Sequence, residues 1–303
     1  MKKNLKKRIA VVTMVGAAAV AALSLSACGK KEQGTIKIAS KPMTEQYVLT
    51  EMLGALIEQD LGVKVEITKG VGGGTTNIQP ALLKGDFDLY PEYTGTGWLT
   101  VLKKEQENDP DVLYENLQKG YEEMGLHWTG LYGFQNSYVL AVRKEAADQD
   151  QLKTFSDLAA VSDKLVFGGN PDYMEREDGF NYLASAYNMN FKDVKDIDIA
   201  LKYKAMEGKE IDVTNAYTTD AQLSAADVTL LEDDKHIFAT YYGATVVRQD
   251  TLKKYPKLEE TLEKLTGLIS DDEMRAMNYA VEIDKKDEKD VAREFLKSKG
   301  LLK

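Results

Sequence analysis

Tyrosine is the residue type in this sequence with the clearest potential for chemistry. The chain has 16 tyrosines against 8 phenylalanines and 2 tryptophans. Several stand beside Thr, Gly, Asn or Pro rather than inside apolar runs, namely Tyr93, Tyr138, Tyr217, Tyr241 and Tyr242. A quaternary ammonium group cannot donate a hydrogen bond, so proteins hold it against aromatic ring faces, each worth about 0.5–2 kcal/mol. These tyrosines therefore indicate a pocket for such a cation, although each one taken singly can equally belong to the core or the surface.

Patterns for catalysis are weak by comparison. The two histidines, His127 and His236, are far apart and lack the spacing of metal ligands. The sequence has no Gly-x-Ser-x-Gly motif and no phosphate-binding loop ending in Gly-Lys-Ser/Thr. Residues 71–75 form a glycine-rich loop before a helix, which can bind an anion through free N–H groups or serve only as a turn. We therefore expect a protein that is not an enzyme and that needs no metal or cofactor.

One internal echo indicates two similar halves. Residues 87–94 (FDLYPEYT) and 211–218 (IDVTNAYT) both run apolar, Asp, apolar, three residues, Tyr-Thr. Each follows a glycine, Gly85 or Gly208, that ends a lysine-containing helix. We interpret them as equivalent strands of two lobes, each placing a tyrosine just past the carboxyl end of a strand, where ligands bind in open α/β sheets. The match is short, and coincidence is the alternative.

Strand and helix patterns alternate along the chain. Strands are expected at 35–39, 63–68, 87–90, 137–142, 165–168, 211–214 and 228–231. Helices are expected from Pro42, from a Thr75 or Thr76 cap to a stop at Gly85, from Asp109-Pro110, from the capping box at 270–273 and from Asp287. This alternation predicts an α/β fold with parallel sheets and helices on both faces.

The N-terminus has the pattern of an export signal. Residues 1–10 carry five positive charges and no acid, and residues 9–25 are almost wholly apolar or small. The apolar run is short for a membrane-spanning helix and ends in Leu25-Ser26-Ala27-Cys28, which is similar to the bacterial lipobox. We expect a signal peptide at 1–27, a lipid (palmitate) on Cys28 and a polar tether at 28–33. An uncleaved transmembrane anchor is the alternative.

The composition agrees with export. Cys28 is the only cysteine, so no internal disulfide forms, and acylation removes a free thiol. The net charge is −10 for the whole chain and about −15 once the five basic residues of the leader are gone. This acidity argues against nucleic acid as a partner and is compatible with a cationic or zwitterionic ligand. We expect a lipid-anchored protein at the outer face of the cell membrane.

Four segments of the mature chain resemble one known family. They are Thr44-Glu45-Gln46-Tyr47, residues 86–96 (DFDLYPEYTGT), Arg176-Glu177-Asp178-Gly179 and residues 212–223 (DVTNAYTTDAQL). These segments are similar to those of the glycine betaine/carnitine/choline-binding lipoproteins of osmoprotectant ABC importers. The resemblance covers essentially all of the mature chain.

The resemblance implies a two-lobed periplasmic-binding-protein-like fold (type II) in the α/β class. The chain would cross twice between the lobes, and the ligand cleft would lie between them. The first lobe would comprise residues 34–131 plus 235–303, and the second lobe residues 132–234.

The resemblance also implies a ligand site. A trimethylammonium group would lie in a cage of four tyrosines, Tyr93 and Tyr241 from the first lobe and Tyr138 and Tyr217 from the second. Gln46 and Thr96 would hold the carboxylate or hydroxyl end of the ligand. In relatives narrowed to choline the position of Thr96 is an aspartate, so Thr96 predicts a site that tolerates a zwitterion such as glycine betaine or carnitine.

Two departures from the family pattern bear on this site. Members often have Pro-Pro before the last cage tyrosine, whereas Ala239-Thr240 stands here. That leaves the choice between Tyr241 and Tyr242 open, and Tyr241 is favoured. After Gly179 the family often runs Tyr-Pro-Gly, whereas residues 180–182 are Phe-Asn-Tyr here, which affects a loop near the cleft.

These observations predict the extracytoplasmic solute-binding subunit of an ABC importer, a monomer that delivers a quaternary-ammonium osmoprotectant to separate permease and ATPase subunits. One alternative is the same fold with a polar amino acid as ligand, but the sequence places no Arg and Asp pair for it. A second alternative is an extracytoplasmic sensor or a lipid-anchored hydrolase. The hydrolase would need a nucleophile–base pair that the sequence does not offer.

Overall fold

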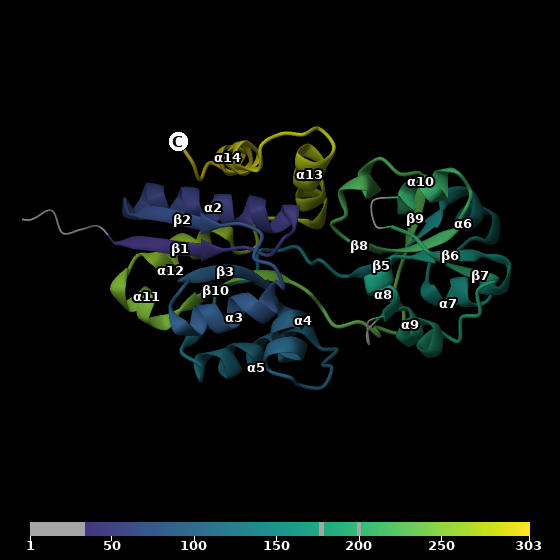
Figure 1. Ribbon diagram of the computed structural model, residues 1–303, viewed down its shortest axis with the longest axis horizontal. Helices are drawn as coiled ribbons and strands as arrows, with labels where there is room; N and C mark the ends of the chain where they lie inside the picture. The colour runs from purple at the N-terminus through teal and green to yellow at the C-terminus, as the bar shows by residue number, and fades with distance from the viewer. Residues whose placement is uncertain (1–33, 176–178, 199–200) are drawn as a thin grey trace, which may run out of the picture. The chain divides into compact units, whose positions relative to one another are not determined.

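The computed structural model describes residues 34–175, 179–198 and 201–303 (Figure 1). The expected signal peptide at 1–27, the Cys28 lipid site, the tether at 28–33 and residues 176–178 of the third family segment lie outside the described residues. No helix within the described ranges is long and apolar enough to cross a bilayer. The hydrophobic cores all lie within one unit, Ile36–Lys303.

Two five-stranded sheets, each with its own helices, form a first and a second lobe. The first sheet has the order β2 (Lys64–Thr68), β1 (Thr35–Ala39), β3 (Leu89–Tyr93), β10 (Gly243–Arg248), β4 (Leu126–Trp128). The second has the order β7 (Asp193–Asp196), β6 (Val166–Gly169), β8 (Val213–Tyr217), β5 (Tyr138–Arg143), β9 (Val228–Leu231). The two orders are equivalent, because β3 and β8, which carry the internal echo, both stand at the centre of their sheet.

The expectation of purely parallel sheets is wrong, because each sheet is mixed. β1 pairs with β3 in parallel, and β6 pairs with β8 in parallel, but β10 and β5 run antiparallel to all their neighbours. These two strands are the ones that follow the connections between the sheets. Each enters its sheet beside the last residue of the central strand, Gly243 beside Tyr93 and Tyr138 beside Tyr217. A strand that enters at the carboxyl end of its neighbour must run in the opposite direction.

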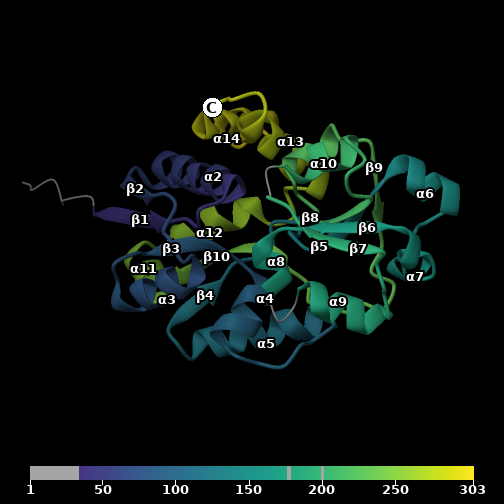
Figure 2. The ribbon, with the colours of Figure 1, turned by 45° about the vertical axis from the view of Figure 1, so that its right-hand side comes forward.

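Helices cover both faces of the first sheet, as predicted. They are α2 (Thr44–Leu61), α3 (Thr75–Lys84), α4 (Thr94–Thr96), α5 (Pro110–Glu122), α11 (Gln249–Lys254), α12 (Leu258–Leu262), α13 (Asp271–Glu282) and α14 (Glu288–Ser298). Strand side chains alternate between two cores, Leu89 packing with α2 and α14 and Tyr90 with α3 and α5. Figures 1 and 2 show α2 and α14 on one side of this sheet and α3 and α5 on the other.

The second lobe carries shorter helices. They are α6 (Lys144–Asp150), α7 (Phe155–Ala159), α8 (Pro171–Glu175), α9 (Phe180–Tyr187) and α10 (Lys202–Glu207). Its larger core includes Leu140, Phe167 and Val213 from the three central strands together with α7 and α9 residues. A smaller core under α10 includes Tyr203 and Met206.

The predicted caps at Asp109, Ser270 and Asp287 and the predicted stop at Gly85 are confirmed, whereas α2 begins at Thr44 and not at Pro42, with Met43 at its N-cap. The Asp109 side chain accepts hydrogen bonds from the N–H groups of Asp111 and Val112, and Ser270 and Glu273 form a reciprocal capping box. The predicted Thr75 or Thr76 cap of α3 is wrong, because Gly74 holds the N-cap position. The Thr75 hydroxyl instead donates to the buried Glu92 carboxylate at 2.6 Å.

The two copies of the internal echo begin with aspartates in equivalent roles. The Asp88 carboxylate accepts the backbone N–H of Lys37 on the neighbouring strand at 2.8 Å. The Asp212 carboxylate accepts the backbone N–H of Val166 on its neighbouring strand at 2.9 Å. Each central strand begins at the residue after its aspartate, so it runs later than predicted and ends on the tyrosine itself.

The lobe boundaries at 131/132 and 234/235 stay predictions. Side-chain packing favours limits a few residues later, since Tyr132 and Phe134 belong to the core of the first sheet. Ile237 and Phe238 pack against the core of the second sheet.

Candidate functional site

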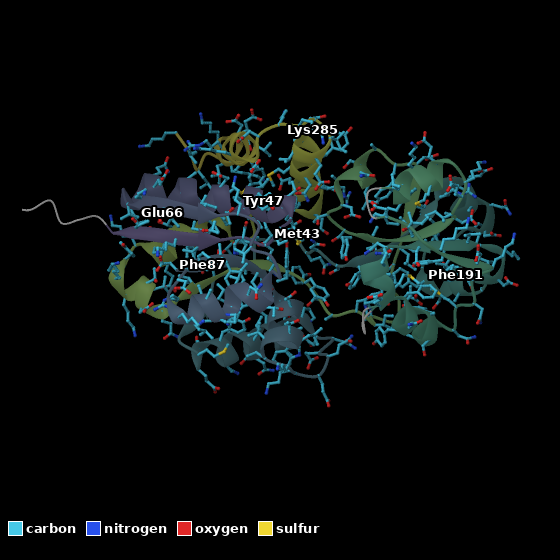
Figure 3. All side chains as sticks on the ribbon, viewed as in Figure 1. Met43, Tyr47, Glu66, Phe87, Phe191 and Lys285 are labelled. Atoms are coloured by element: carbon cyan, nitrogen blue, oxygen red, sulfur yellow. The ribbon has the colours of Figure 1, made fainter. Side chains whose placement is uncertain are left out.

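A cavity of about 610 Å³ is lined by residues from both lobes. Five of the six predicted ligand-binding residues line it, namely Tyr93, Thr96, Tyr138, Tyr217 and Tyr241. Met43, labelled in Figure 3, lies just before α2 and lines the same cavity. The fold thus brings these five residues to one cavity from positions up to 148 residues apart, and their role as ligand-binding residues stays a prediction.

The sheet topology explains this convergence. Tyr93 is the last residue of β3 and Tyr217 the last residue of β8, whereas they were expected just past the strand ends. Tyr138 opens β5 directly opposite Tyr217 in the antiparallel register. Tyr241 stands two residues before β10, whose first residue pairs with Tyr93. Each lobe therefore contributes one tyrosine from a strand end and one from the chain that enters beside it.

Tyr138 is the centre of an aromatic cluster. Its ring centroid lies 5.2 Å from that of Tyr217 and 6.2 Å from that of Tyr241, with the Tyr241 ring nearly perpendicular at 82°. Tyr173 and Phe238, which sequence reasoning missed, lie 5.3 and 5.0 Å from it on centroid distances. One of these ring pairs is edge-to-face and the other three are tilted, and aromatic contacts at such distances favour particular ring orientations. Neither residue lies in the four segments that resemble the family, so the sequence offered no signal for them.

The structure separates the two candidates for the last cage tyrosine. Tyr241 lines the main cavity, and its ring meets Tyr138. Tyr242 lines a different, smaller depression together with Gln135 and Arg275. This geometry favours Tyr241.

Gln46 lies apart from the cavity surface. Its side chain is fully buried on α2, and it does not belong to the cavity lining. Neither atom of its amide has a hydrogen-bond partner of good geometry within the described part of the chain. The role expected for Gln46 at the polar end of a ligand stays a prediction.

Glu45, the residue before Gln46, reaches the cavity instead. It is 2% exposed, and its carboxylate accepts hydrogen bonds from the Tyr93 hydroxyl and, at 3.1 Å, from the Asn136 amide. Burial raises the pKa of Glu45 above its ordinary value, and the hydrogen bonds offset part of that effect. The signal for this residue was its place in the segment 44–47, but sequence reasoning assigned it no role.

A buried ion pair lies beside Tyr93 and contacts both its backbone and its ring. The Lys41 ammonium contacts the Glu92 carboxylate, with side-chain exposures of 8% and 0%. The same ammonium lies 4.7 Å from the centroid of the Tyr93 ring, and the backbone N–H of Tyr93 donates to Glu92 at 2.7 Å. Lys41 itself lines the cavity. The Tyr93 ring thus already has one ammonium group within cation–π distance.

A second ion pair occupies the wall of the second lobe. The buried Lys202 ammonium lies 2.6 Å from the Asp220 carboxylate. It also lies 5.0 Å from the Tyr203 ring centroid and 5.9 Å from that of Tyr217. The cavity therefore presents aromatic faces, two lysine ammoniums and carboxylates together, an arrangement that suits a small ligand carrying both signs of charge.

Close packing at Gly95 provides a test of how the tyrosine wall is held. A methyl group on Gly95 would lie 2.7 Å from Cε1 of Tyr241 and 2.8 Å from the backbone oxygen of Thr240. We expect Gly95→Ala to displace Tyr241, to destabilise the fold by about 1–3 kcal/mol and to weaken ligand binding. Gly72→Ala is the matched control, because nothing lies within 4 Å of its added methyl group. Thermal unfolding and ligand titration of both variants check this, and equal affinities would contradict it.

Comparisons with known proteins identify the family of this chain and confirm its fold. The family model described as the substrate binding domain of ABC-type glycine betaine transport system matches residues 34–298. The ergothioneine transport permease/ergothioneine binding protein EgtU of Helicobacter pylori (strain G27) is 44% identical over 271 residues, which are 89% of this chain and 48% of that protein. The chain thus spans about half the length of this relative.

Two further relatives match over nearly their whole length. The carnitine transport binding protein OpuCC of Listeria monocytogenes is 35% identical over 300 residues, 98% of this chain and 97% of that protein. A crystal structure described as a glycine betaine/carnitine/choline ABC transporter superposes with a TM-score of 0.83 at 33% identity, covering 88% of this chain and 99% of that one. The predicted two-lobed α/β fold is confirmed. The chain belongs to the family of substrate binding domains of ABC-type glycine betaine transport systems.

Proposed function

We propose that this protein is the extracytoplasmic solute-binding subunit of an ABC importer and that it holds a trimethylammonium ligand in the tyrosine-lined cavity. The observation that carries the proposal is the meeting of Tyr93, Tyr138, Tyr217 and Tyr241 on one cavity. Three or four cation–π contacts of about 0.5–2 kcal/mol each supply about 1.5–8 kcal/mol, against the about 8 kcal/mol of micromolar binding, so the upper end of this range provides most of such an affinity. Thr96 and the lysines of the same cavity suit the anionic end of a zwitterion.

Binding and lobe closure are coupled in this proposal. Two of the four tyrosines come from each lobe, so an incomplete cage binds the cation more weakly than a complete one. A ligand shifts a conformational equilibrium only as far as its affinities for the two states differ. The closed, loaded form is then the species that the transport subunits recognise.

The lipid on Cys28 completes the transport role. A diacylated cysteine anchors the protein without a spanning helix, since each buried methylene contributes about 0.8 kcal/mol. The tether keeps the loaded protein near its permease at a high effective concentration. ATP hydrolysis belongs to partner subunits, and this chain acts as a monomeric binding protein and not as an enzyme.

The relatives narrow the choice of ligand. Their names give ergothioneine, carnitine and glycine betaine as ligands of those proteins. All three compounds join a trimethylammonium group to a carboxylate. Ergothioneine also carries a sulfur-substituted imidazole, and the 44% identity to EgtU favours it as a second candidate beside glycine betaine and carnitine.

A calorimetric or fluorescence titration of the purified mature protein tests the proposal. The ligands are glycine betaine, carnitine, choline, ergothioneine and, as a control without a trimethylammonium group, proline. We expect saturable binding of at least one zwitterionic trimethylammonium compound and none of proline. Absence of a saturable response to all four trimethylammonium compounds would refute the cage.

A further inference from the structure

Glu45 is a carboxylate in an unusual setting, even for a binding cavity. It lies in the first turn of α2, is 2% exposed and lines the cavity. The groups that contact it are uncharged: the Tyr93 hydroxyl, the amides of Asn136 and Asn278, and Thr219. Burying an ionised carboxylate without a cation is costly, so such a group is retained where a ligand supplies the missing charge.

The other acids around the cavity are already matched. Asp220 is paired with Lys202, and the buried Glu92, which does not line the cavity, is paired with Lys41. Glu282 lies at the rim and is exposed to solvent. Among the described residues that line the cavity, Glu45 is therefore the one buried carboxylate that no basic side chain contacts.

The hydroxyl of Tyr93 links Glu45 to the proposed cage. A phenol whose hydroxyl donates a hydrogen bond to a carboxylate gains electron density in its ring, which makes the ring face more negative. A cation on that face is then held both by the enriched ring and by the charge behind it. A neutral ligand group of the same shape would gain neither from the more negative ring nor from the carboxylate charge.

We propose that Glu45 is a specificity-determining residue that acts through Tyr93 and gives the cavity the negative charge that selects a cationic head group. This inference rests on the proposed function and extends it, because the four tyrosines alone do not explain why a buried carboxylate faces the cavity.

Proton linkage follows from this role. Burial raises the pKa of Glu45 in the ligand-free cavity, and a nearby cation favours the ionised form. Binding of the cation should therefore release a proton, and affinity should rise with pH as Glu45 ionises. The charged or titratable groups that surround it, directly or across the cavity, are Tyr93, Lys41, Glu92, Lys202, Asp220 and Glu282.

The test compares cationic and uncharged head groups on two variants. Glycine betaine and ergothioneine are the cationic probes, and 3,3-dimethylbutanoate, in which carbon replaces the quaternary nitrogen of glycine betaine, is the uncharged-head probe. Glu45→Gln keeps the shape and removes the charge. Glu58→Gln is the matched control, because Glu58 is an exposed glutamate on the same helix.

We expect Glu45→Gln to weaken the binding of the cationic probes about tenfold or more, since the loss of one charge–cation interaction changes a dissociation constant by about a factor of ten. The dissociation constant of 3,3-dimethylbutanoate should stay unchanged. Glu58→Gln should bind all three like the wild type. Equal losses for charged and uncharged heads would assign Glu45 a structural role only and overturn the inference. If the wild type binds neither cationic probe, the proposed function fails together with it.

A measurement on the wild type makes the test independent of how the variant folds. Calorimetry in two buffers of different ionisation enthalpy counts the protons released on binding, and the dissociation constant is followed from about pH 5 to pH 8. We expect proton release and tighter binding at the higher pH. No proton release together with a flat pH profile would overturn the inference even if Glu45→Gln did not fold.

Discussion

Replacing Lys41 by methionine should destabilise the protein by about 3–5 kcal/mol, the usual result of removing one partner of a buried ion pair. The substitution leaves the Glu92 carboxylate, whose side chain is 0% exposed, without its cation. Glu92 keeps the hydrogen bonds from Thr75 and from the backbone of Tyr93, but these neutral donors do not replace a full charge. Guanidinium unfolding at neutral pH, with the slope compared between variants, measures the loss.

Two controls separate the effect of breaking the Lys41–Glu92 ion pair from the effect of losing a lysine side chain. Lys64→Met removes a lysine whose ion pair with Glu66 is 67% and 50% exposed, and it should change stability by less than about 1 kcal/mol. The double variant Lys41→Met, Glu92→Gln should recover much of the loss, because it removes the uncompensated charge. A double variant as unstable as Lys41→Met would mean that packing, not charge, accounts for the effect.

The position of this pair couples stability to binding. Glu92 holds the backbone N–H of Tyr93, and the Lys41 ammonium lies over the Tyr93 ring. A ring that is already held by a charge network loses little conformational entropy when a ligand arrives. A similar lysine–carboxylate pair stands beside a tyrosine of the second lobe, where the Lys202 ammonium is paired with Asp220 and lies 5.9 Å from the Tyr217 ring centroid.

Local chemistry explains what the sequence predicted well. The β1 and β9 strands, the Asp109 cap and the Ser270 capping box depend on residues within a few positions of one another. The echo at 87–94 and 211–218 worked for a different reason. Its aspartates and tyrosines occupy equivalent ends of two equivalent strands. The same structural positions in the two lobes therefore carry the same residue types, and the sequence shows this as a repeat.

What the sequence missed depends on contacts between distant residues. The antiparallel direction of β5 and β10 follows from where the chain enters each sheet, and no local pattern encodes that. Thr75 reads as a helix cap until Glu92 is placed beside its hydroxyl. Glu45 and Lys41 look like ordinary charged residues beside a helix start, and only their burial in the cavity wall makes them candidates for function.

Replacing Tyr217 by alanine should weaken the binding of a trimethylammonium ligand at least about tenfold, since it removes one cation–π face and opens the wall of the cavity. The fold should survive, because Tyr217 is the last residue of β8 and the rest of the strand keeps its pairing with β5 and β6. The neighbouring Tyr138 ring, 5.2 Å away, remains packed against Phe238. Titration beside a thermal unfolding curve separates lost affinity from lost structure.

Tyr242→Ala is the matched control, because it removes the same side chain from a residue next to the cage but outside the cavity. It should bind like the wild type, whereas Tyr241→Ala should follow Tyr217→Ala. If Tyr242→Ala lost affinity and Tyr241→Ala did not, the cage would be completed by the other tyrosine and the second-lobe rings would need a different partner across the cavity. If Tyr217→Ala bound as tightly as the wild type, Tyr217 would not belong to the ligand site. The presence of a tyrosine at the equivalent strand end of each lobe would then no longer explain how the ligand is recognised.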